Sequence, residues 1–395
     1  MLAALLGAAA AAAMHRVTLA TAGPRAALGA GLAVALDPAL VFYTPALMTE
    51  GVTASLLALA AWAALGARQA TSGRAPSAAT NAKPGRAPVF AALSGLVLGA
   101  ATLVRPQSLL FAPFFGALAA PGGASLRARA RDAVIATALA LATCLPWTLR
   151  NCERMGRCTL VSFNGGWNLL IGATPSAAGT WAPLEVPESC RLVFDEAAKD
   201  ACFGRVARER IAEAPLTWLS ALPAKWSSTF DVPGAAPWYL HDSNPQAFPD
   251  GSKLALAAAE IVTARLALAS CLLALGLAPG PRRGARAVIA AIGLVGVTGA
   301  FGAHAYLGYL ALVAAAALFG ASLVRDRPLP ALAAVVVAGT ALVHGAFFGA
   351  GRYALVVAPF VMALAGASAL TPWPRAWRGA LARLAARVRR APSIR

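Results

Sequence analysis

The stretch Ala46–Leu65, ALMTEGVTASLLALAAWAAL, contains one acid, Glu50, followed by 15 residues without any charge. A helix needs about 20 mostly apolar residues to cross a bilayer, and this run comes close to that length. An ionisable side chain at membrane depth is costly, and it therefore requires a partner or a function. The stretch predicts a membrane helix whose first turn carries a glutamate.

Apolar runs of the same kind recur along the whole chain. Of its 395 residues, 59% are hydrophobic and only 13% are charged, whereas soluble globular proteins carry about 25% charged residues. We therefore predict an all-α polytopic membrane protein with about 10–11 membrane segments. The predicted segments are Leu2–Ala13, Ala26–Leu47, Gly51–Leu65, Val89–Val104, Leu109–Ala120, Ala133–Leu149, Ile261–Leu277, Val288–Ala303, Ala305–Leu323, Leu329–Phe348 and Ala354–Leu370.

The net charge of +18 is concentrated in alternate loops and in the C-terminal tail. Excess Lys and Arg mark the cytoplasmic loops of membrane proteins. The charge therefore indicates membrane topology, with the lipid bilayer as a partner, and it does not indicate nucleic-acid binding. The basic stretches are His15–Arg25, Arg68–Arg86, Arg127–Arg131, Arg282–Arg286, Arg325–Arg327 and the tail from Arg375 to Arg395.

The long loop from Arg150 to Lys253 differs from these basic stretches. It holds 11 of the 16 acids against 10 bases, so we expect it to face away from the cytoplasm. Eleven segments and a cytoplasmic tail would put the N-terminus on the same outer side. The predicted domains are N-terminal membrane helices at 1–149, an extracytoplasmic loop domain at 150–253, C-terminal membrane helices at 254–372 and a basic cytoplasmic tail at 373–395.

Four cysteines support this orientation. Cys152, Cys158, Cys190 and Cys202 lie in the outer loop, where an oxidising compartment allows disulfides. Among the connectivities open to four cysteines, we expect Cys152 to pair with Cys158 and Cys190 with Cys202. Four free thiols are the alternative. A zinc site is disfavoured, because the spacing lacks C-x-x-C and only His241 lies nearby.

Polar side chains near the outer ends of the membrane segments are the candidate site residues, because charged groups at membrane depth are functional candidates by default. Arginine offers phosphate oxygens a fixed charge and bidentate geometry. A carboxylate acts as a general base toward a hydroxyl or holds a divalent cation. The set therefore suits a polar headgroup that bears phosphate. The candidates are Asp37, Glu50, Arg105, His344, Arg352 and Tyr353.

The interruption of the apolar pattern before Pro106 predicts a tight hairpin or a broken helix. Each candidate residue also has a purely structural interpretation. The structural interpretations are a helix cap for Glu50, a packing pair with a buried arginine for Asp37, a snorkelling interfacial side chain for Arg105, an interface anchor for Arg352 with Tyr353, and a satisfied core histidine for His344.

Five stretches, in the same order along the chain, carry a resemblance to a known family. They are ALDPALVFYTPALMTEGVTASLLALAAW (35–62), LSGLVLGAATLVRPQSLLFAP (93–113), LPWTLRNCERMGRCTLVSFNGGWNLLIGATPSAAGTW (145–181), RVARERIAEAPLTWLSALPAKW (205–226) and LVHGAFFGAGRYALVVAPFVMALAG (342–366). Together they resemble the GT-C superfamily of glycosyltransferases. The similar branch uses polyprenyl-phosphate-linked sugars and includes the protein O-mannosyltransferases and the aminoarabinose transferase of lipid A.

The resemblance implies transfer of a sugar, with inversion, from a polyprenyl-phosphate donor to a glycan, lipid or protein acceptor on the outer face of the bacterial inner membrane. Glu50 matches the family's second acid, Arg105 its Arg/Lys-Pro residue, and Arg352 with Tyr353 its late RY pair. The lipid-linked sugar is then a co-substrate. A divalent metal stays open, because some relatives bind one at the outer acids. We expect catalytic acids at Glu50 and Asp37 and phosphate ligands at Arg105, His344, Arg352 and Tyr353.

The chain departs from the family at its beginning. The family's principal catalytic acid lies in the first outer loop, and no Asp or Glu precedes Asp37 here. We expect the chain to lack the family's first helices and that loop, through a misassigned start or as a degenerate copy that is inactive as written. The alternative function is a non-catalytic transporter or partner subunit. Transporters tend to contain repeated halves, and we find none in the sequence.

Overall fold

The computed structural model describes residues 1–46, 48–66, 86–174, 179–232, 235–299 and 304–370. The predicted tail at 373–395 and the basic residues between 68 and 83 lie outside these ranges. Every regular element in the described ranges is a helix, and a single isolated β-bridge pairs Thr180 with Gly349. The predicted all-α class is confirmed.

The helices fall into three groups along the chain. The first group is α1 (Leu2–Ala22), α2 (Pro24–Ala35), α3 (Pro38–Phe42), α4 (Thr49–Ala64), α6 (Ala87–Val104), η3 (Pro106–Phe111), α7 (Ala112–Ala119) and α8 (Leu126–Arg154). The second is α9 (Gly165–Gly172), α10 (Glu188–Arg191), α11 (Glu196–Glu213), α12 (Pro215–Ser220), α13 (Leu222–Phe230) and α14 (Ala236–Ser243). The third is α15 (Asp250–Leu277), α16 (Arg283–Thr298), α17 (Ala305–Ala317), α18 (Ala321–Asp326), α19 (Pro328–Ala346), η5 (Gly351–Val357) and α20 (Ala358–Leu370).

Six helical runs in the described ranges are long and apolar enough to span a membrane, which indicates a multi-pass integral membrane protein. They are α1, α6, α8, α15, α19 and the run Gly351–Leu370 formed by η5 and α20. The apolar helices α4 and α17 and the run Pro106–Ala119 are shorter. Several predicted segments therefore form helices shorter than a full span.

Two prolines divide the predicted apolar runs. The residue before a proline is pushed out of the helical conformation toward an extended one. Arg105 accordingly has φ −143° and ψ 112°, and the chain turns from α6 into the 3-10 helix η3, as the sequence predicts. Asp37 precedes Pro38, and its Oδ2 accepts a hydrogen bond from the Leu40 amide at 3.3 Å. The expected single segment Ala26–Leu47 is thus broken between α2 and α3.

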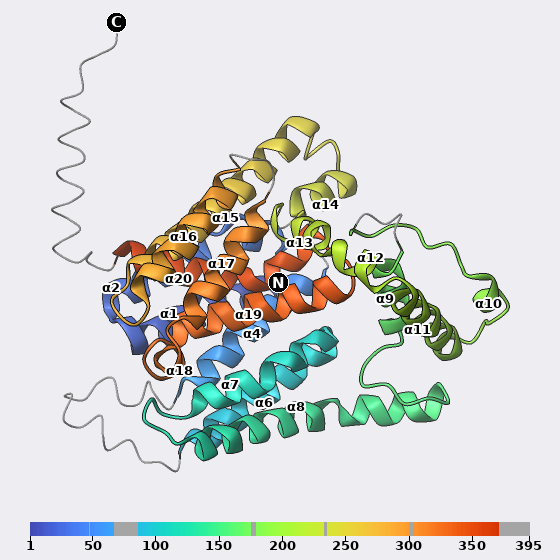
Figure 1. Cartoon of the computed structure of the whole chain (residues 1–395), viewed down its shortest axis with the longest axis horizontal. Coiled ribbons are helices and arrows are strands. Elements are labelled where there is room, and N and C mark those ends of the chain that lie inside the picture. Colours follow the sequence, from blue (N-terminus) through green and yellow to red (C-terminus); the bar gives the residue numbers. More distant parts are fainter. Residues whose placement is uncertain (47, 67–85, 175–178, 233–234, 300–303, 371–395) are drawn as a thin grey trace, which may run out of the picture.

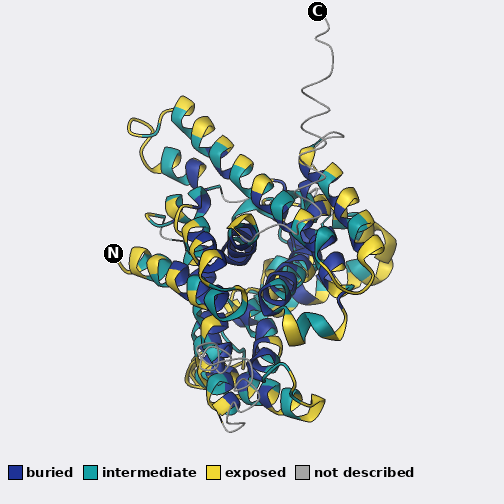
Figure 2. Cartoon of the chain, turned by 90° about the vertical axis from the view of Figure 1, so that its left-hand side faces the viewer, coloured by how far each residue is buried: buried dark blue, intermediate teal, exposed yellow. Residues whose placement is uncertain are grey.

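The most buried helices lie in the middle of the bundle. Figure 2 shows the buried residues gathered on central helices, with the exposed residues on the outer ones. Small residues let these helices approach closely, as they do in other membrane bundles. A methyl group on Gly29 of α2 would lie 2.2 Å from the carbonyl oxygen of Gly366 in α20, so this contact excludes any larger side chain.

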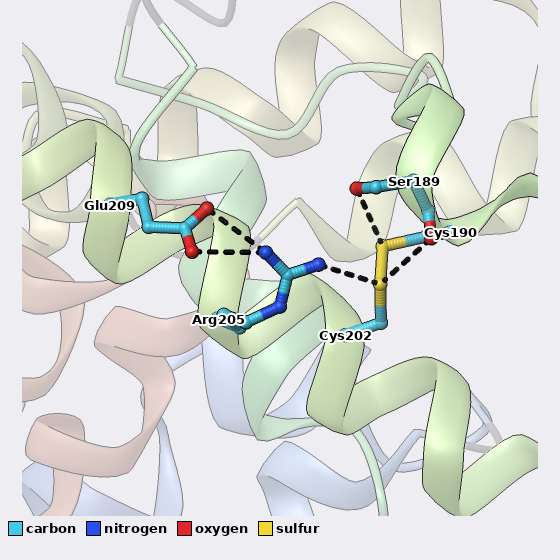
Figure 3. Close-up of a disulfide and its surroundings, with 5 residues drawn as sticks. All are labelled: Ser189, Cys190, Cys202, Arg205 and Glu209. Carbon is cyan, nitrogen blue, oxygen red and sulfur yellow. Dashed lines mark hydrogen bonds and ion pairs between the residues drawn. A yellow bond between two sulfur atoms is a disulfide. The ribbon is translucent and has the colours of Figure 1, made fainter.

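The helices of the loop domain gather at one end of the bundle. Figure 1 shows α9 to α12 on the right, beyond the end of α19 and above the far end of α8. One disulfide joins Cys152 at the end of α8 to Cys158, and a second joins Cys190 of α10 to Cys202 of α11. These are the pairs that we predict from the sequence. Beside the second bond, Arg205 forms an ion pair with Glu209 and approaches the Cys202 sulfur at 3.7 Å (Figure 3).

Candidate functional site

The Glu50 carboxylate lies between two guanidinium groups. Its Oε1 is 2.6 Å from Nη1 of Arg105, to which it is hydrogen-bonded, and 3.4 Å from Nε of Arg352. The Glu50 side chain is only 2% exposed, whereas those of Arg105 and Arg352 are 14% and 31% exposed. The Glu50 side chain is therefore buried, and the side chains of the two arginines are partly exposed at the surface.

Local structure explains how these three residues meet. Glu50 occupies the first turn of α4. The extended conformation before Pro106 takes Arg105 out of the path of α6, and its Nη1 also donates to Thr49 Oγ1 at 3.1 Å. Arg352 belongs to the 3-10 helix η5, which follows the end of α19. The three charged groups therefore come from places where regular α-helix begins or ends, and the helices around them fix their positions.

An aromatic side chain lies beside both arginines. The guanidinium carbons of Arg105 and Arg352 lie 5.0 and 5.1 Å from the ring centre of Tyr353, within the range of cation–π attraction. The His344 ring stacks on Tyr353 with centres 4.0 Å apart, and its Nδ1 is 3.0 Å from the carbonyl oxygen of Phe348. Because a carbonyl only accepts, Nδ1 carries the hydrogen in this contact. We call Glu50, Arg105, His344, Arg352 and Tyr353 the Glu50 cluster.

The loop domain contributes a residue that sequence reasoning missed. Arg352 donates from Nη1 to the hydroxyl of Tyr239 in α14 and from Nη2 to the hydroxyl of Tyr353, each at 3.3 Å. The ring of Tyr239 meets that of Tyr43 edge-on, with centres 6.3 Å apart. Tyr239 carries no charge and lies far from any apolar run, so a search for charged groups at membrane depth does not find it.

The electrostatics of the cluster favour an anion. Two positive groups and one negative group are in direct contact, so one positive charge is left over. Among the described residues, Nε of Arg105 and Nε of Arg352 have no hydrogen-bond partner, although the latter lies within ion-pair distance of Glu50. These two atoms are buried, so a phosphate would be met by the terminal nitrogens of the arginines, each of which carries two N–H donors.

Asp37 does not join the cluster. Its side chain is 97% buried and caps α3 through the Leu40 amide. It lines a cavity of about 20 Å³, together with Tyr309 of α17 and Ala264 of α15. In the structure the carboxylate of Asp37 lies in the packing between these helices, and among the described residues it has backbone amides as partners and not the buried arginine of the structural interpretation.

Lys225 of α13 is a second residue that was not among the candidates. It is 1% exposed, and its Nζ donates to the carbonyl oxygen of Gly345 at 3.1 Å and to that of Ala346 at 3.5 Å. These carbonyls end α19, so the ammonium caps the helix that carries His344. The sequence offers 10 basic residues between 150 and 253, and nothing distinguishes Lys225 except its place in the stretch 205–226 quoted above.

The described residues contain no group of three or more His, Cys, Asp or Glu side chains that could hold a metal ion. Comparison with known proteins gives no family: no family model, no curated protein and no solved structure matches the chain. The geometry of the Glu50 cluster is therefore the main basis for a function.

Proposed function

We propose that the protein is a membrane glycosyltransferase that moves a sugar from a polyprenyl-phosphate donor to an acceptor hydroxyl on the extracytoplasmic face. The observation that carries this proposal is the contact of Glu50 with Arg105 and Arg352. Residues about 300 positions apart in sequence meet at one end of the bundle, with an excess of positive charge. A lipid phosphate that leaves during sugar transfer needs such a site.

In the proposed reaction the acceptor oxygen attacks the anomeric carbon, and the bond from that carbon to the phosphate oxygen breaks. The electron pair of this bond leaves with the polyprenyl phosphate, and the acceptor proton passes to the phosphate oxygen that the broken bond releases. Arg105 and Arg352 stabilise the phosphate as its negative charge develops, which lowers the barrier. Tyr239 and Tyr353 each accept one hydrogen bond from a terminal nitrogen of Arg352 and so hold its guanidinium in place, and each of these nitrogens keeps a second N–H for a phosphate oxygen.

Glu50 has a positioning role in this proposal. Its carboxylate is buried and already engaged by two guanidinium groups, so it does not face the space that an acceptor would occupy. The Glu50 carboxylate holds the guanidinium groups of Arg105 and Arg352 close together, and the three groups together carry one net positive charge. The proposal includes the GT-C-like arrangement of about 10–11 membrane segments and the bacterial inner membrane as the location.

The first test is binding of polyprenyl phosphate, the part of the donor that does not depend on the sugar. Purified protein in lipid nanodiscs is titrated with undecaprenyl phosphate, and the bound lipid is counted by native mass spectrometry. We expect Arg105→Gln and Arg352→Gln each to weaken binding about 10-fold, the effect of losing one charged hydrogen bond. Arg208→Gln is the matched control, because Arg208 is an exposed arginine of the loop domain.

The outcomes separate the proposals. Equal binding by wild type, both cluster variants and the control would remove the phosphate site and the proposed function with it. A second arm follows radiolabelled sugar from undecaprenyl-phosphate hexose to any product in a membrane extract. A protein that binds the lipid through Arg105 and Arg352 but never transfers the label would be the non-catalytic subunit of the alternative interpretation.

A further inference from the structure

A cavity of about 560 Å³ lies at the opposite end of the bundle from the Glu50 cluster. It opens between the last turns of α1, α15 and α20 and the first turn of α19. Pro328 lines the cavity and His344 belongs to the cluster. The two residues are 16 positions apart on one helix, which corresponds to about 24 Å. The cavity is therefore separate from the proposed phosphate site.

Most of the cavity wall is apolar, and its volume falls in the range of about 300–1,000 Å³ found for small-molecule sites. The apolar lining comes from α15, α19 and α20, and includes Leu273, Leu277, Leu329 and Leu364. These helices are among the candidate membrane spans. A cavity of this kind, at the end of membrane helices, is positioned to take a hydrocarbon chain from the surrounding lipid.

One arginine lines the cavity and a second is buried next to it. Arg327 lines it, and Nη2 of Arg327 donates to the carbonyl oxygen of Pro279 at 2.7 Å. Behind it lies Arg286, which is completely buried and donates from Nη2 to the carbonyl oxygen of Ala278, another lining residue. The two guanidinium groups lie 4.3 and 3.8 Å from the ring centre of Phe319. Two like charges therefore share one ring next to the cavity.

Their positive charge is incompletely balanced by the protein. Nε and Nη1 of Arg286 are buried and have no hydrogen-bond partner among the described residues. Asp326 also lines the cavity; its carboxylate is paired with Arg325 at 3.0 Å and attracts Arg327 from a greater distance, without a direct ion pair. The same end of the bundle carries the basic turn between α15 and α16. Among the described residues, no carboxylate forms a direct ion pair with Arg286 or Arg327. A bound anion near Arg327 would reduce the repulsion between these two guanidinium groups.

We propose that this cavity binds an anionic phospholipid, with one acyl chain against the apolar wall and the phosphate at Arg327. The chemistry of the two parts points to one amphiphile, since Arg327 lines the same cavity as the apolar wall. Basic pockets between membrane helices on the cytoplasmic side are known to hold anionic headgroups. The charge pattern of the sequence puts this end of the bundle on that side. The inference does not rest on the proposed transferase activity.

The experiment uses the full chain, delipidated in a mild detergent and examined by native mass spectrometry. It is titrated separately with dioleoyl phosphatidylglycerol, dioleoyl phosphatidylcholine and inorganic phosphate. We expect phosphatidylglycerol to bind about fivefold more tightly than phosphatidylcholine, the effect of one Arg beside an anionic headgroup. Inorganic phosphate, which has no acyl chain, is expected to bind far more weakly than either lipid.

Variants locate the binding. Arg327→Gln should abolish the preference for phosphatidylglycerol, and Ala274→Trp, which fills the cavity, should reduce the binding of both lipids. Arg127→Gln is the matched control, because Arg127 is an exposed arginine near the start of α8 and lines no part of the cavity. It should keep the preference of the wild type.

Several results would overturn the proposal. Equal binding of both lipids by the wild type would mean that an acyl chain alone occupies the cavity. A preference that Arg127→Gln loses as readily as Arg327→Gln would reflect general surface charge. Binding of inorganic phosphate as tight as that of phosphatidylglycerol would identify a free-phosphate site. Absence of any lipid binding would leave the cavity to another occupant.

Discussion

Single residues of the Glu50 cluster depend on one another's charge. Removing one partner of a buried ion pair is strongly destabilising, because the remaining charge loses its compensation. Glu50 compensates two guanidinium groups at once, and both also lie over Tyr353. Without the carboxylate, two positive charges would remain beside one aromatic ring with no negative group in contact with them. The glutamate at the start of α4 is therefore explained by the arginines that it holds.

Glu50→Gln should lower the stability of the folded protein. We expect a loss of about 1–3 kcal/mol, which is less than for a fully buried pair because both arginines reach solvent. The measurement is the thermal unfolding midpoint in detergent. Glu209→Gln is the control, since its ion pair with Arg205 is about half exposed and should change stability by less than about 0.5 kcal/mol. Equal shifts for the two variants would contradict a central role of Glu50.

Lys225 predicts a pH dependence of stability. Burial lowers the pKa of this lysine, which lies in the loop domain, from 10.5 to about 8. At pH values between these two pKa values, the lysine binds a larger fraction of a proton in the unfolded chain than in the folded protein. The contribution of Lys225 to the free energy of unfolding therefore rises with pH. We expect the difference in unfolding midpoint between wild type and Lys225→Met to shift in favour of the wild type from pH 8 to pH 10, by about 2 °C.

The methionine variant serves as the reference for the wild type in this experiment. Every other titratable group is present in both proteins, so its effect cancels in the difference between their unfolding midpoints. Lys225→Arg, which keeps its charge at all these pH values, should show no such shift relative to Lys225→Met. A constant difference between wild type and Lys225→Met from pH 8 to pH 10 would show that the buried ammonium stays charged throughout, and the inferred role of burial would be wrong.

At the scale of the elements, the interface of α2 with α20 depends on two glycines. Gly29 and Gly366 face each other so closely that a Cβ on either would lie 2.2 Å from the other's carbonyl oxygen. Backbone does not yield as a flexible side chain does, so a methyl group must push the helices apart. Such an approach gains packing contacts, which are the main source of helix association where no hydrophobic effect acts between helices.

Gly29→Ala should therefore destabilise the protein by about 1–3 kcal/mol, the usual cost of overpacking. Gly7→Ala is the matched control, because Gly7 also lies in a helix, α1, and a Cβ there would have no atom within 4 Å. Alanine should stabilise that position by up to about 1 kcal/mol through its higher helix propensity. Thermal unfolding of both variants gives the comparison. Shifts of the same sign would contradict the close contact.

For the whole molecule, much of the fold follows from composition and hydropathy. The apolar runs predict the helical class, and the prolines after Asp37 and Arg105 mark where helices end, because a proline acts on the residue before it. Glu50, Arg105 and Arg352 stand out as charges in apolar surroundings. The sequence does not tell that Asp37 lies outside the cluster, since its position depends on how α3 packs. Tyr239 and Lys225 are equally hidden, because the loop domain folds back onto the bundle.

The sidedness of the molecule is the last prediction, and single-cysteine labelling tests it. Gly251 at the start of α15 and Gly123 in the turn before α8 are exposed, and a Cβ at either has open space around it. The basic residues near Gly123 predict the cytoplasm, and the nearly neutral loop next to Gly251 predicts the outside. In intact cells an impermeant maleimide should label Gly251→Cys and reach Gly123→Cys only after the membrane is permeabilised.

The native protein gives this experiment a low background. Cys144 and Cys271 are fully buried, and the other four cysteines are paired in disulfides. Labelling of Gly123→Cys alone in intact cells would reverse the topology. It would put the Glu50 cluster in the cytoplasm, where an outward-facing lipid-linked sugar is out of reach, and it would put the cavity lined by Arg327 in the outer leaflet. The Glu50 cluster and the cavity lie at opposite ends of the same helices. One labelling experiment therefore tests the predicted side of the membrane for both sites.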